Sequence, residues 1–517
     1  MKSTFFSFRN GDVGGIAYSV VNNIVNYIIV IATLTALDWP RDIIFMRVVP
    51  GMSIGLLVGG FYYSYMAAKL AKKEGRTNVT ALPSGVNTPG MFVFLFGVIT
   101  PLHFAIGDPE IVWRASVAAC FIGGLVEVIG SIIGPWLKNR LPRAAMLGTV
   151  AGIGFIWMAT QGLFDIYGDP VLGMPILLLS LLGLFGGYVF PKKINPFVVA
   201  IVGGIVFALV LGRVNPDFSG IGVTLPNPAL TFPAVFQGME HVAPFLPVII
   251  PIMIFSFIGT MNNVESAEAA GDKYNVREAQ IVDGVCTMVS ALFGGVIPNT
   301  VWLGHPGLKS ANAGTSYSWI SALILGASGL FGLFTLLHSV VPMAVAGITF
   351  LWCAVIMVAQ AHKEVKPKHF AAVCIAMIPS VADFLYTQVT GVFGVFGEWA
   401  YTQPDGLAGF GGERVSDLLS AGVMWFGVPA VRAGSILTGL LLGAAVVFII
   451  DKELDKAGVI FVVAALLSLT GFIHSAALAI NFTSPFMIGY LIMAILCFIL
   501  ARGKGKWFDA PDDFNYV

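Results

Sequence analysis

The chain reads Thr-Ala-Leu-Pro-Ser-Gly-Val-Asn-Thr-Pro-Gly over residues 80–90, inside an otherwise apolar region. A second stretch, residues 295–307, reads Gly-Val-Ile-Pro-Asn-Thr-Val-Trp-Leu-Gly-His-Pro-Gly. Neither stretch can form a continuous helix, because proline removes a backbone N–H group and glycine weakens a helix. Within a membrane, irregular backbone is tolerated only where it is buried in protein or lines a wet cavity. Two interrupted segments in the two halves of a long apolar chain therefore indicate the binding site of a transporter.

The composition indicates a polytopic membrane protein. Of the 517 residues, 57% are hydrophobic and only 11% are charged, whereas soluble domains carry about 25% charged residues. The 28 lysines and arginines balance the 28 acidic residues, so no nucleic-acid partner is indicated. The five cysteines lack metal-binding spacing, and no phosphate-binding P-loop is present. We therefore expect no metal site and no cofactor.

Apolar segments of about 20 residues, enough to cross the hydrocarbon core of a bilayer, divide the chain into sixteen predicted spans. The predicted spans are 13–36, 44–68, 79–103, 112–136, 144–164, 171–190, 195–213, 243–266, 277–295, 296–316, 317–337, 342–360, 369–394, 433–451, 457–476 and 483–502. The connection at 214–242 separates seven spans from the rest. Because seven is odd, the second set enters the membrane in the opposite orientation. This predicts an inverted repeat of seven plus seven spans, 11–213 and 243–451, with two appended helices at 457–502.

Clusters of positive charge predict the orientation. The clusters are Lys69, Lys72, Lys73 and Arg76; Lys138, Arg140 and Arg143; Lys192 and Lys193; Lys363, Lys366 and Lys368; and Arg502, Lys504 and Lys506. With a cytoplasmic N-terminus and sixteen spans, every cluster lies on the cytoplasmic side, as the positive-inside rule requires. We therefore expect a multi-pass protein of the plasma or inner membrane, with both termini in the cytoplasm.

Carboxylates in the predicted eighth span are candidates for function, because inserting one costs about 2.5–3.5 kcal/mol. Asn262, Glu265 and Glu268 are three residues apart and share one helix face. Glu265 is a candidate substrate anchor and proton carrier, since a carboxyl group in a low dielectric can titrate near neutral pH. Glu268 is a second proton-coupling candidate, and Asp272 a weaker one. The alternative is that the helix has already reached cytoplasmic water, where these side chains are only solvated.

The two interrupted segments add polar side chains and freed backbone groups. After each Pro-Gly pair a helix can begin and direct its free N–H groups and the positive end of its dipole at a cavity. Such a site suits a small, flat, polar or anionic solute. The alternative is that the side chains satisfy only their own turns. The candidate substrate-binding side chains of these segments are Ser84, Asn87, Thr88, Asn299, Thr300 and His305.

Other polar groups within the predicted spans indicate less. Glu127, Asp283 and Asp383 could each pair with a neighbouring helix. Asn22, Asn23 and Asn26 in the first span are expected to form hydrogen bonds between helices, as amides in membranes often do.

The sequence from Arg277 to Thr300 contains Asp283-Gly284-Val285, ends in Pro298-Asn299-Thr300 and resembles the xanthine/uracil permeases. These form the nucleobase–ascorbate transporter family, also called nucleobase:cation symporter-2. Residues 81–90 are similar to the matching segment of a bacterial branch, and the resemblance covers most of residues 11–450. It implies a seven-plus-seven inverted repeat with core and gate domains. It also implies short strands in spans three and ten, with substrate bound between them and helped by span eight.

The resemblance further implies nucleobase transport coupled to H+ or Na+, by an elevator-type motion in a homodimer. The span-eight glutamate of the family aligns with Glu265, and a slip of one turn would place Asn262 there. In span ten the family's signature is kept only at Gly307, so its second carboxylate is missing. A hypothesis is that His305 supplies this contact and titrates in its place.

Three hypotheses for function follow. The leading one is a secondary active transporter that imports a nucleobase-like solute, such as a purine or uracil, by H+ symport. The alternative is an anion transporter of the same fold, of the sulfate or dicarboxylate type. A non-transporting membrane scaffold is the third, although a scaffold has little reason to place two broken helices in a bilayer. No catalytic set or cofactor motif indicates an enzyme, and the role of the loop at 396–432 stays open.

Overall fold

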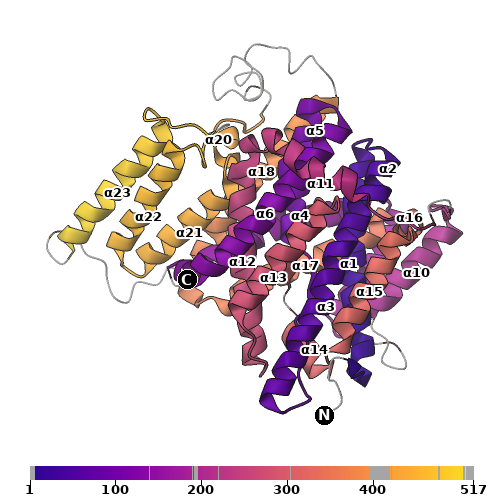
Figure 1. Cartoon of the computed structure of the whole chain (residues 1–517). Coiled ribbons are helices and arrows are strands. Elements are labelled where there is room, and N and C mark those ends of the chain that lie inside the picture. Colours follow the sequence, from indigo (N-terminus) through magenta and orange to yellow (C-terminus); the bar gives the residue numbers. More distant parts are fainter. Residues whose placement is uncertain are drawn as a thin grey trace. The chain divides into compact units, whose positions relative to one another are not determined.

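The computed structural model describes residues 6–138, 140–188, 190, 196–218, 221–302, 304–395, 420, 422–475, 478–504 and 507 (Figure 1). Helices make up most of this part of the chain. It contains eight helices that are long and apolar enough to cross a membrane, and four shorter apolar helices. The residues predicted as the loop at 396–432 fall largely outside the described ranges.

The helices of the first half follow the predicted spans closely. They are α1 (Asn10–Ala36), α2 (Arg41–Ile43), α3 (Val49–Glu74), α4 (Thr88–Phe94), α5 (Thr100–Ile106), α6 (Pro109–Lys138), α7 (Arg143–Ile153), α8 (Thr160–Gly168), α9 (Pro170–Leu184) and α10 (Pro196–Val210). Single π-helical turns join α2 to α3 (Ile44–Val48), α4 to α5 (Leu95–Ile99) and α7 to α8 (Gly154–Ala159). Each of these three pairs is therefore one continuous rod.

The second half has the same correspondence. Its helices are α11 (Pro228–Gln237), α12 (Leu246–Ala269), α13 (Val276–Leu292), α14 (His305–Ser310), α15 (Ser316–Leu330), α16 (Leu333–Val340), α17 (Met343–Glu364), α18 (Phe370–Val395), α20 (Val428–Arg432), α21 (Ser435–Ile450), α22 (Leu454–Leu469) and α23 (Pro485–Gly503). Short 3₁₀ turns cover Gly238–His241, Ala243–Phe245 and Pro367–His369.

Each interrupted segment contains one short strand, as predicted. Strand β1 (Ser84–Val86) pairs antiparallel with β2 (Asn299–Val301), and Gly85 lies opposite Thr300. Two further backbone bonds extend the ladder, from Asn87 N to Pro298 O (2.9 Å) and from Trp302 N to Pro83 O (3.1 Å). Backbone groups that cannot join a helix are thus satisfied by the partner segment, which is the condition for irregular chain inside a bilayer.

The chain divides into two compact units, each drawn from both halves of the sequence. Unit 1 comprises Met1–Leu137, Gly162–Val242 and Ile252–Thr349. Unit 2 comprises Lys138–Gln161, Ala243–Pro251 and Phe350–Val517. The strand pair belongs to unit 1. The predicted repeat boundaries, 11–213 and 243–451, stay a prediction.

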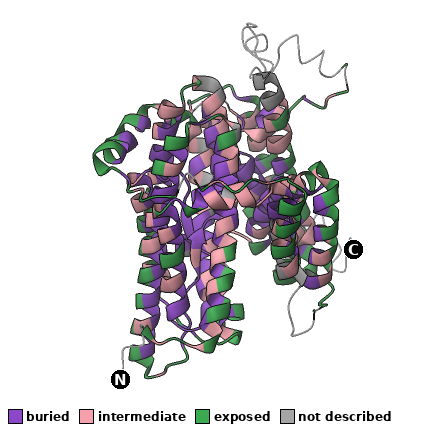
Figure 2. Cartoon of the chain, turned by 90° about the vertical axis from the view of Figure 1, so that its right-hand side faces the viewer, coloured by how far each residue is buried: buried purple, intermediate pink, exposed green. Residues whose placement is uncertain are grey.

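The strand pair lies in the apolar core of unit 1, which includes Val301 of β2. Figure 2 shows that buried residues lie on the inner faces of the helices and exposed residues on their outer faces. Helix α3 packs against α13 and α15 there. Members of this core include Tyr63, Met66 and Leu70 of α3, Val282 and Cys286 of α13, Val301 of β2 and Tyr317 of α15. Helices α1 and α3 contact β1, and α13 contacts β2, so helices of unit 1 hold both strands in this core.

Candidate functional site

Helix α1 anchors strand β1 through an amide side chain. The N–H group of Val86 donates to Asn23 Oδ1 (2.9 Å), and Asn23 Nδ2 donates to Ser19 O (2.9 Å). A Cβ atom at Gly85 would lie 2.5 Å from Asn23 Oδ1, so only glycine allows this approach. Two residues after the strand, Thr88 Oγ1 donates to Asn26 Oδ1 (3.1 Å). The N-terminal helix thus sets the position of β1 and of the residue that starts α4.

The start of α4 is tied to two other helices. Asn87 caps α4, because its Oδ1 accepts from Gly90 N (2.9 Å). Its Nδ2 donates to Ser256 Oγ of α12 (2.7 Å), and Ser256 donates in turn to Glu127 Oε1 of α6 (2.5 Å). Glu127 is 1% exposed. One buried carboxylate therefore fixes, through one serine, where the helix after β1 begins.

A second buried carboxylate holds strand β2. Asp283 of α13 accepts from Tyr63 OH (2.5 Å), Thr260 Oγ1 (2.6 Å) and Val301 N (2.9 Å). Thr260 also lies 3.1 Å from Thr300 Oγ1, oxygen to oxygen. An ionised carboxylate only accepts hydrogen bonds, so three donors around one aspartate leave it well satisfied.

The two carboxylates belong to one hydrogen-bonded set. Thr287 Oγ1 accepts from Asn299 N (3.0 Å) and donates to Glu127 Oε2 (3.4 Å). We name the whole set the strand-pair network; its members are Asn87, Glu127, Ser256, Thr260, Asp283, Thr287, Asn299 and Thr300. In the sequence analysis Glu127 and Asp283 are weaker candidates than Glu265. The free-energy cost of placing a carboxylate inside a membrane applies to them as well, and it is the feature of the sequence that points to them.

Helix α12 presents a different face to the strands from the one expected. Besides Ser256 and Thr260, Asn263 reaches them, since its Nδ2 donates to Val301 O (2.8 Å). Glu265 follows two residues later and therefore lies roughly on the opposite side of the helix, because each residue turns it by about 100°. The structure thus brings Asn87, Thr88, Asn299 and Thr300 together at the strand pair.

The remaining candidates on α12 lie at different depths. Asn262 and Glu265 are half-buried, and Asn262 Oδ1 has no hydrogen-bond partner among the residues that the structure describes. Glu268 is exposed in the last turn of the helix, where its Oε1 accepts from Lys273 Nζ (2.6 Å). Ser84 faces α3, where a Cβ atom at Gly59 would lie 2.9 Å from its Oγ.

His305 lies in a charged cluster centred on Asp272. Its Nε2 is 3.0 Å from Thr80 O and 3.1 Å from Asp272 Oδ2, and the imidazole is 1% exposed. Asp272 is itself fully buried and accepts from Arg76 Nη2 (2.8 Å), Lys309 Nζ (2.6 Å) and Thr80 N (3.0 Å). This Asp272 cluster joins the chain before β1, the α12–α13 turn and α14.

The Asp272 cluster predicts a pH-dependent contribution to stability. Burial raises the pKa of Asp272, but hydrogen bonds from His305, Lys309, Thr80 and Arg76 outweigh it and lower the pKa from 3.8 to about 2. A depressed pKa gives stability that is complete above the unfolded value and is lost as the pH falls through the folded value. This contribution is about 2 kcal/mol. Asp272→Asn should therefore lower the melting temperature at pH 7, and the difference from wild type should narrow between pH 4 and pH 2.

Asp455→Asn, at an exposed position of α22, is the control and should change the melting temperature little at any pH. A difference between Asp272→Asn and wild type that stays constant from pH 7 to pH 2 would contradict the assignment.

Taken together, fold and site define a polytopic transporter fold in which two broken spans meet as a strand pair inside one compact unit. The chain is similar to the solved transmembrane domain of a cyanobacterium bicarbonate transporter, BicA, with a TM-score of 0.53 and 17% identity, over 74% of this chain and 98% of that one. The predicted fold class, an all-α seven-plus-seven inverted repeat with two interrupted spans, is confirmed.

Two further structures are similar over about three quarters of the chain. The murine Solute Carrier 26 family member A9 (Slc26a9) anion transporter in the inward-facing state has a TM-score of 0.49 and 11% identity, over 76% of this chain and 69% of that one. Another structure of SLC26A9 has a TM-score of 0.42 and 12% identity, over 73% and 64%. No protein-family model matches the sequence, and no curated protein matches it.

The resemblance to the xanthine/uracil permeases is wrong, because the solved structure whose fold this chain shares is the transmembrane domain of a bicarbonate transporter. The physical reason lies in the motifs that carried the resemblance. Asn87 caps a helix, and the Pro-Asn-Thr run of 298–300 enters a strand. These motifs describe how a span is broken and capped, which transporters of different solutes share, and they carry no information on the solute.

Proposed function

We propose that this protein is a secondary transporter that carries a small anion, bound beside the strand pair of unit 1. The observation that carries the proposal is that the strand pair places a helix start immediately after β1. From Thr88 the chain runs as one helical rod through the π-turn to Ile106 (Figure 1). Its N-terminus carries the positive end of the dipole, which favours an anion in a site closed to water.

The chemistry around this helix start supports an anion. Thr88 and Thr300 contribute hydroxyl groups. The first hydrogen bond of α4 runs from Met91 N to Asn87 O (2.7 Å). The N–H group of Thr88 comes before it and therefore has no acceptor within the helix. The nearby carboxylates of Glu127 and Asp283 are each 1% exposed and enclosed by donors. They act as supports of the backbone, because their oxygens accept hydrogen bonds from groups on the neighbouring elements. The shared fold with a bicarbonate transporter points to the same class of solute.

On the predicted topology, the anion would move across the membrane between the cytoplasmic and outer sides of the strand pair. With both termini in the cytoplasm, the Asp272 cluster lies on the cytoplasmic side of the strand pair and the end of α5 on the outer side. We propose that Thr88 and Thr300 contact the anion, whereas Ser84 faces α3 on the other side of the strand pair. His305 and Asp272 would act on the cytoplasmic side, where they hold α14 to the chain before β1.

Ligand-induced stabilisation tests this proposal. Bicarbonate, sulfate and succinate, added to purified protein at constant ionic strength with gluconate, should each be compared with xanthine and uracil. A ligand of the folded state stabilises it by about 2.7 kcal/mol at a hundred times its Kd. We expect at least one anion to raise the melting temperature and neither base to do so. Stabilisation by a base alone would refute the proposal.

A hydroxyl deletion locates the site. Thr88→Val keeps the shape of the side chain and removes its hydroxyl group, so we expect the Kd for the stabilising anion to rise about tenfold, equivalent to about 1.4 kcal/mol. Thr470→Val is the matched control, because the Thr470 hydroxyl bonds only to carbonyl groups of its own helix (3.1 Å). Equal anion affinity in both variants would move the site away from α4.

A further inference from the structure

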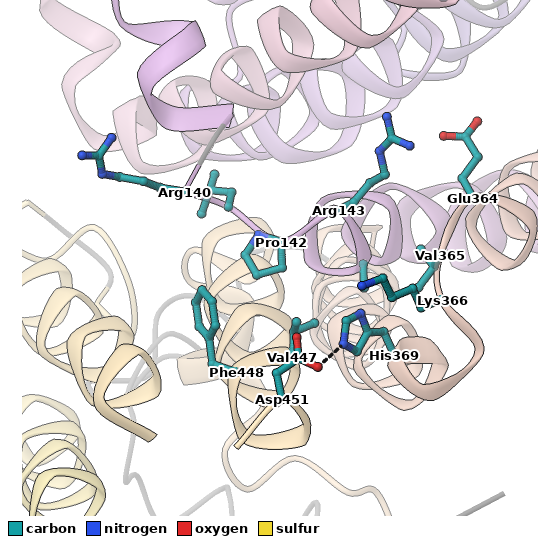
Figure 3. A pocket seen from close by; sticks show the side chains of 12 residues that line it. Arg140, Pro142, Arg143, Glu364, Val365, Lys366, His369, Val447, Phe448 and Asp451 are labelled. Carbon is teal, nitrogen blue, oxygen red and sulfur yellow. Dashed lines mark hydrogen bonds and ion pairs between the residues drawn. The ribbon is translucent and has the colours of Figure 1, made fainter. Parts of the chain in front are cut away.

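Unit 2 contains a cavity of about 420 Å³ at the ends of its apolar helices (Figure 3). Its lining includes Arg143 at the start of α7, Glu364 at the end of α17 and Asp451 just after α21. A place where several membrane-spanning helices end lies at the boundary between hydrocarbon and water. This is the level at which lipid headgroups are found, and on the predicted topology it is the cytoplasmic side.

The charges around the cavity favour an anion. Arg140, Arg143 and Lys366 line it, and Figure 3 shows the two arginines on either side of Pro142. Among the described residues, neither Arg143 nor Lys366 makes an ion pair. Two cations at the cavity are therefore not neutralised by a carboxylate of the protein, which leaves them available to an anionic group.

Asp451, one of the two carboxylates in the lining, is already committed to other partners. Its Oδ1 is 2.5 Å from Lys368 Nζ and 2.8 Å from His369 Nε2. Burial raises the pKa of Asp451, but the hydrogen bonds from Lys368 and His369 outweigh it and lower that pKa below its usual value. Asp451 therefore stays ionised and pairs with Lys368 and His369. It does little to offset the positive charge of Arg143 and Lys366.

The backbone at the start of α7 adds to the positive electrostatic potential of the cavity. Pro142 caps α7, and the first bonds of that helix run from Ala145 N (3.1 Å) and Met146 N (3.3 Å) to Pro142 O. The N–H groups of Arg143 and Ala144 come before them and have no partner within the helix. The positive end of the α7 dipole is thus added to the guanidinium group of Arg143.

Apolar side chains complete the lining. Leu141, Val447 and Phe448 face the cavity beside the cations. Cations next to an apolar wall at the level of the headgroups match an amphiphile with an anionic head, and basic pockets between membrane helices bind phospholipid headgroups in other proteins. We propose that this cavity binds a phosphate group, presented either by an anionic phospholipid or by a soluble phosphate ester.

Two arms of one experiment distinguish the sources. Purified full-length protein in neutral detergent is titrated with dioleoylphosphatidylglycerol, with dioleoylphosphatidylcholine as reference, and separately with glycerol phosphate at constant ionic strength. Melting temperatures give an apparent Kd for each. In Arg143→Gln/Lys366→Gln, we expect the apparent Kd for phosphatidylglycerol to rise about tenfold or more. The matched control, Lys72→Gln/Lys363→Gln, removes two exposed lysines outside the cavity and should leave the Kd unchanged.

Charge-dependent stabilisation by phosphatidylglycerol assigns the site to a lipid, and the same effect with glycerol phosphate alone assigns it to a soluble ester. Equal stabilisation of wild type and double variant by every probe, or equal stabilisation by phosphatidylcholine, would overturn the proposal. The single variants Arg143→Gln and Lys366→Gln repeat the test with less change to the fold. Because the cavity belongs to unit 2, the result is independent of the anion bound at the strand pair.

Discussion

Replacing Asp283 by alanine is expected to destabilise the protein by about 1–3 kcal/mol and to abolish the anion transport proposed above. The substitution removes an acceptor from three buried donors, Tyr63 OH, Thr260 Oγ1 and Val301 N. Tyr63 OH can still donate to Ala279 O (3.1 Å) and Thr260 Oγ1 to Thr300 Oγ1 (3.1 Å), so the N–H group of Val301 bears the main loss. Each unsatisfied buried group costs about 1–3 kcal/mol. Because one of these donors is the backbone of β2, the strand itself should lose its position. The melting temperature in detergent and solute uptake in vesicles measure the two effects.

Asp283→Asn supplies an intermediate case, since an amide keeps one oxygen acceptor and should retain part of the stability. Asp455→Ala, at an exposed position, should leave both the melting temperature and uptake near wild type. If Asp283→Ala melts like wild type, the strand-pair network does not hold β2, and the support assigned to it is refuted.

Replacing Gly51 by alanine is also expected to lower the stability of the protein strongly. A Cβ atom there would lie 2.3 Å from Gly295 N and 2.6 Å from Phe293 O. Both are backbone atoms of the segment that leads into β2, so neither can rotate away. Overpacking of this kind costs about 1–3 kcal/mol, and relief requires α3 to separate from that segment. We expect a lower melting temperature and a strong loss of uptake.

Gly203→Ala in α10 is the matched control for Gly51→Ala. A Cβ atom at Gly203 would meet nothing within 4 Å, and alanine favours a helix over glycine by about 1 kcal/mol. This variant should melt at or slightly above the wild-type temperature. Equal behaviour of the two variants would show that the approach of α3 to the start of β2 does not limit stability.

The existence of the strand pair could be predicted from the sequence, but the helix face that supports it could not. Proline and glycine act on the backbone locally, so the sequences of residues 80–90 and 295–307 predict that the helix is interrupted there, whatever surrounds them. The side of α12 that meets the strands depends on a rotation of about 100° per residue. The choice of Asn262, Glu265 and Glu268, rather than Ser256, Thr260 and Asn263, followed from a spacing that fits more than one face.

The resemblance to the nucleobase family is wrong for a related reason. Asn87 and Asn299 are predicted substrate contacts. In the structure Asn87 bonds to Gly90 N and to Ser256, and Asn299 Nδ2 bonds to Cys286 O of α13. A sequence shows that an amide is present, but it does not show which group the amide bonds. Only the comparison of whole folds showed that the chain is similar to the transmembrane domain of a bicarbonate transporter.

By itself the sequence determined the membrane class, the order of the apolar helices and the two points at which they break, because hydrophobic length and proline content act over short distances. The tertiary structure alone decided that Glu127 and Asp283 support the broken spans and that His305 serves Asp272. These residues lie far from their partners along the chain, up to 225 positions between His305 and Thr80. Such pairings arise only when helices from both halves pack together, since a buried polar group bonds to whichever donor or acceptor the packing brings within reach.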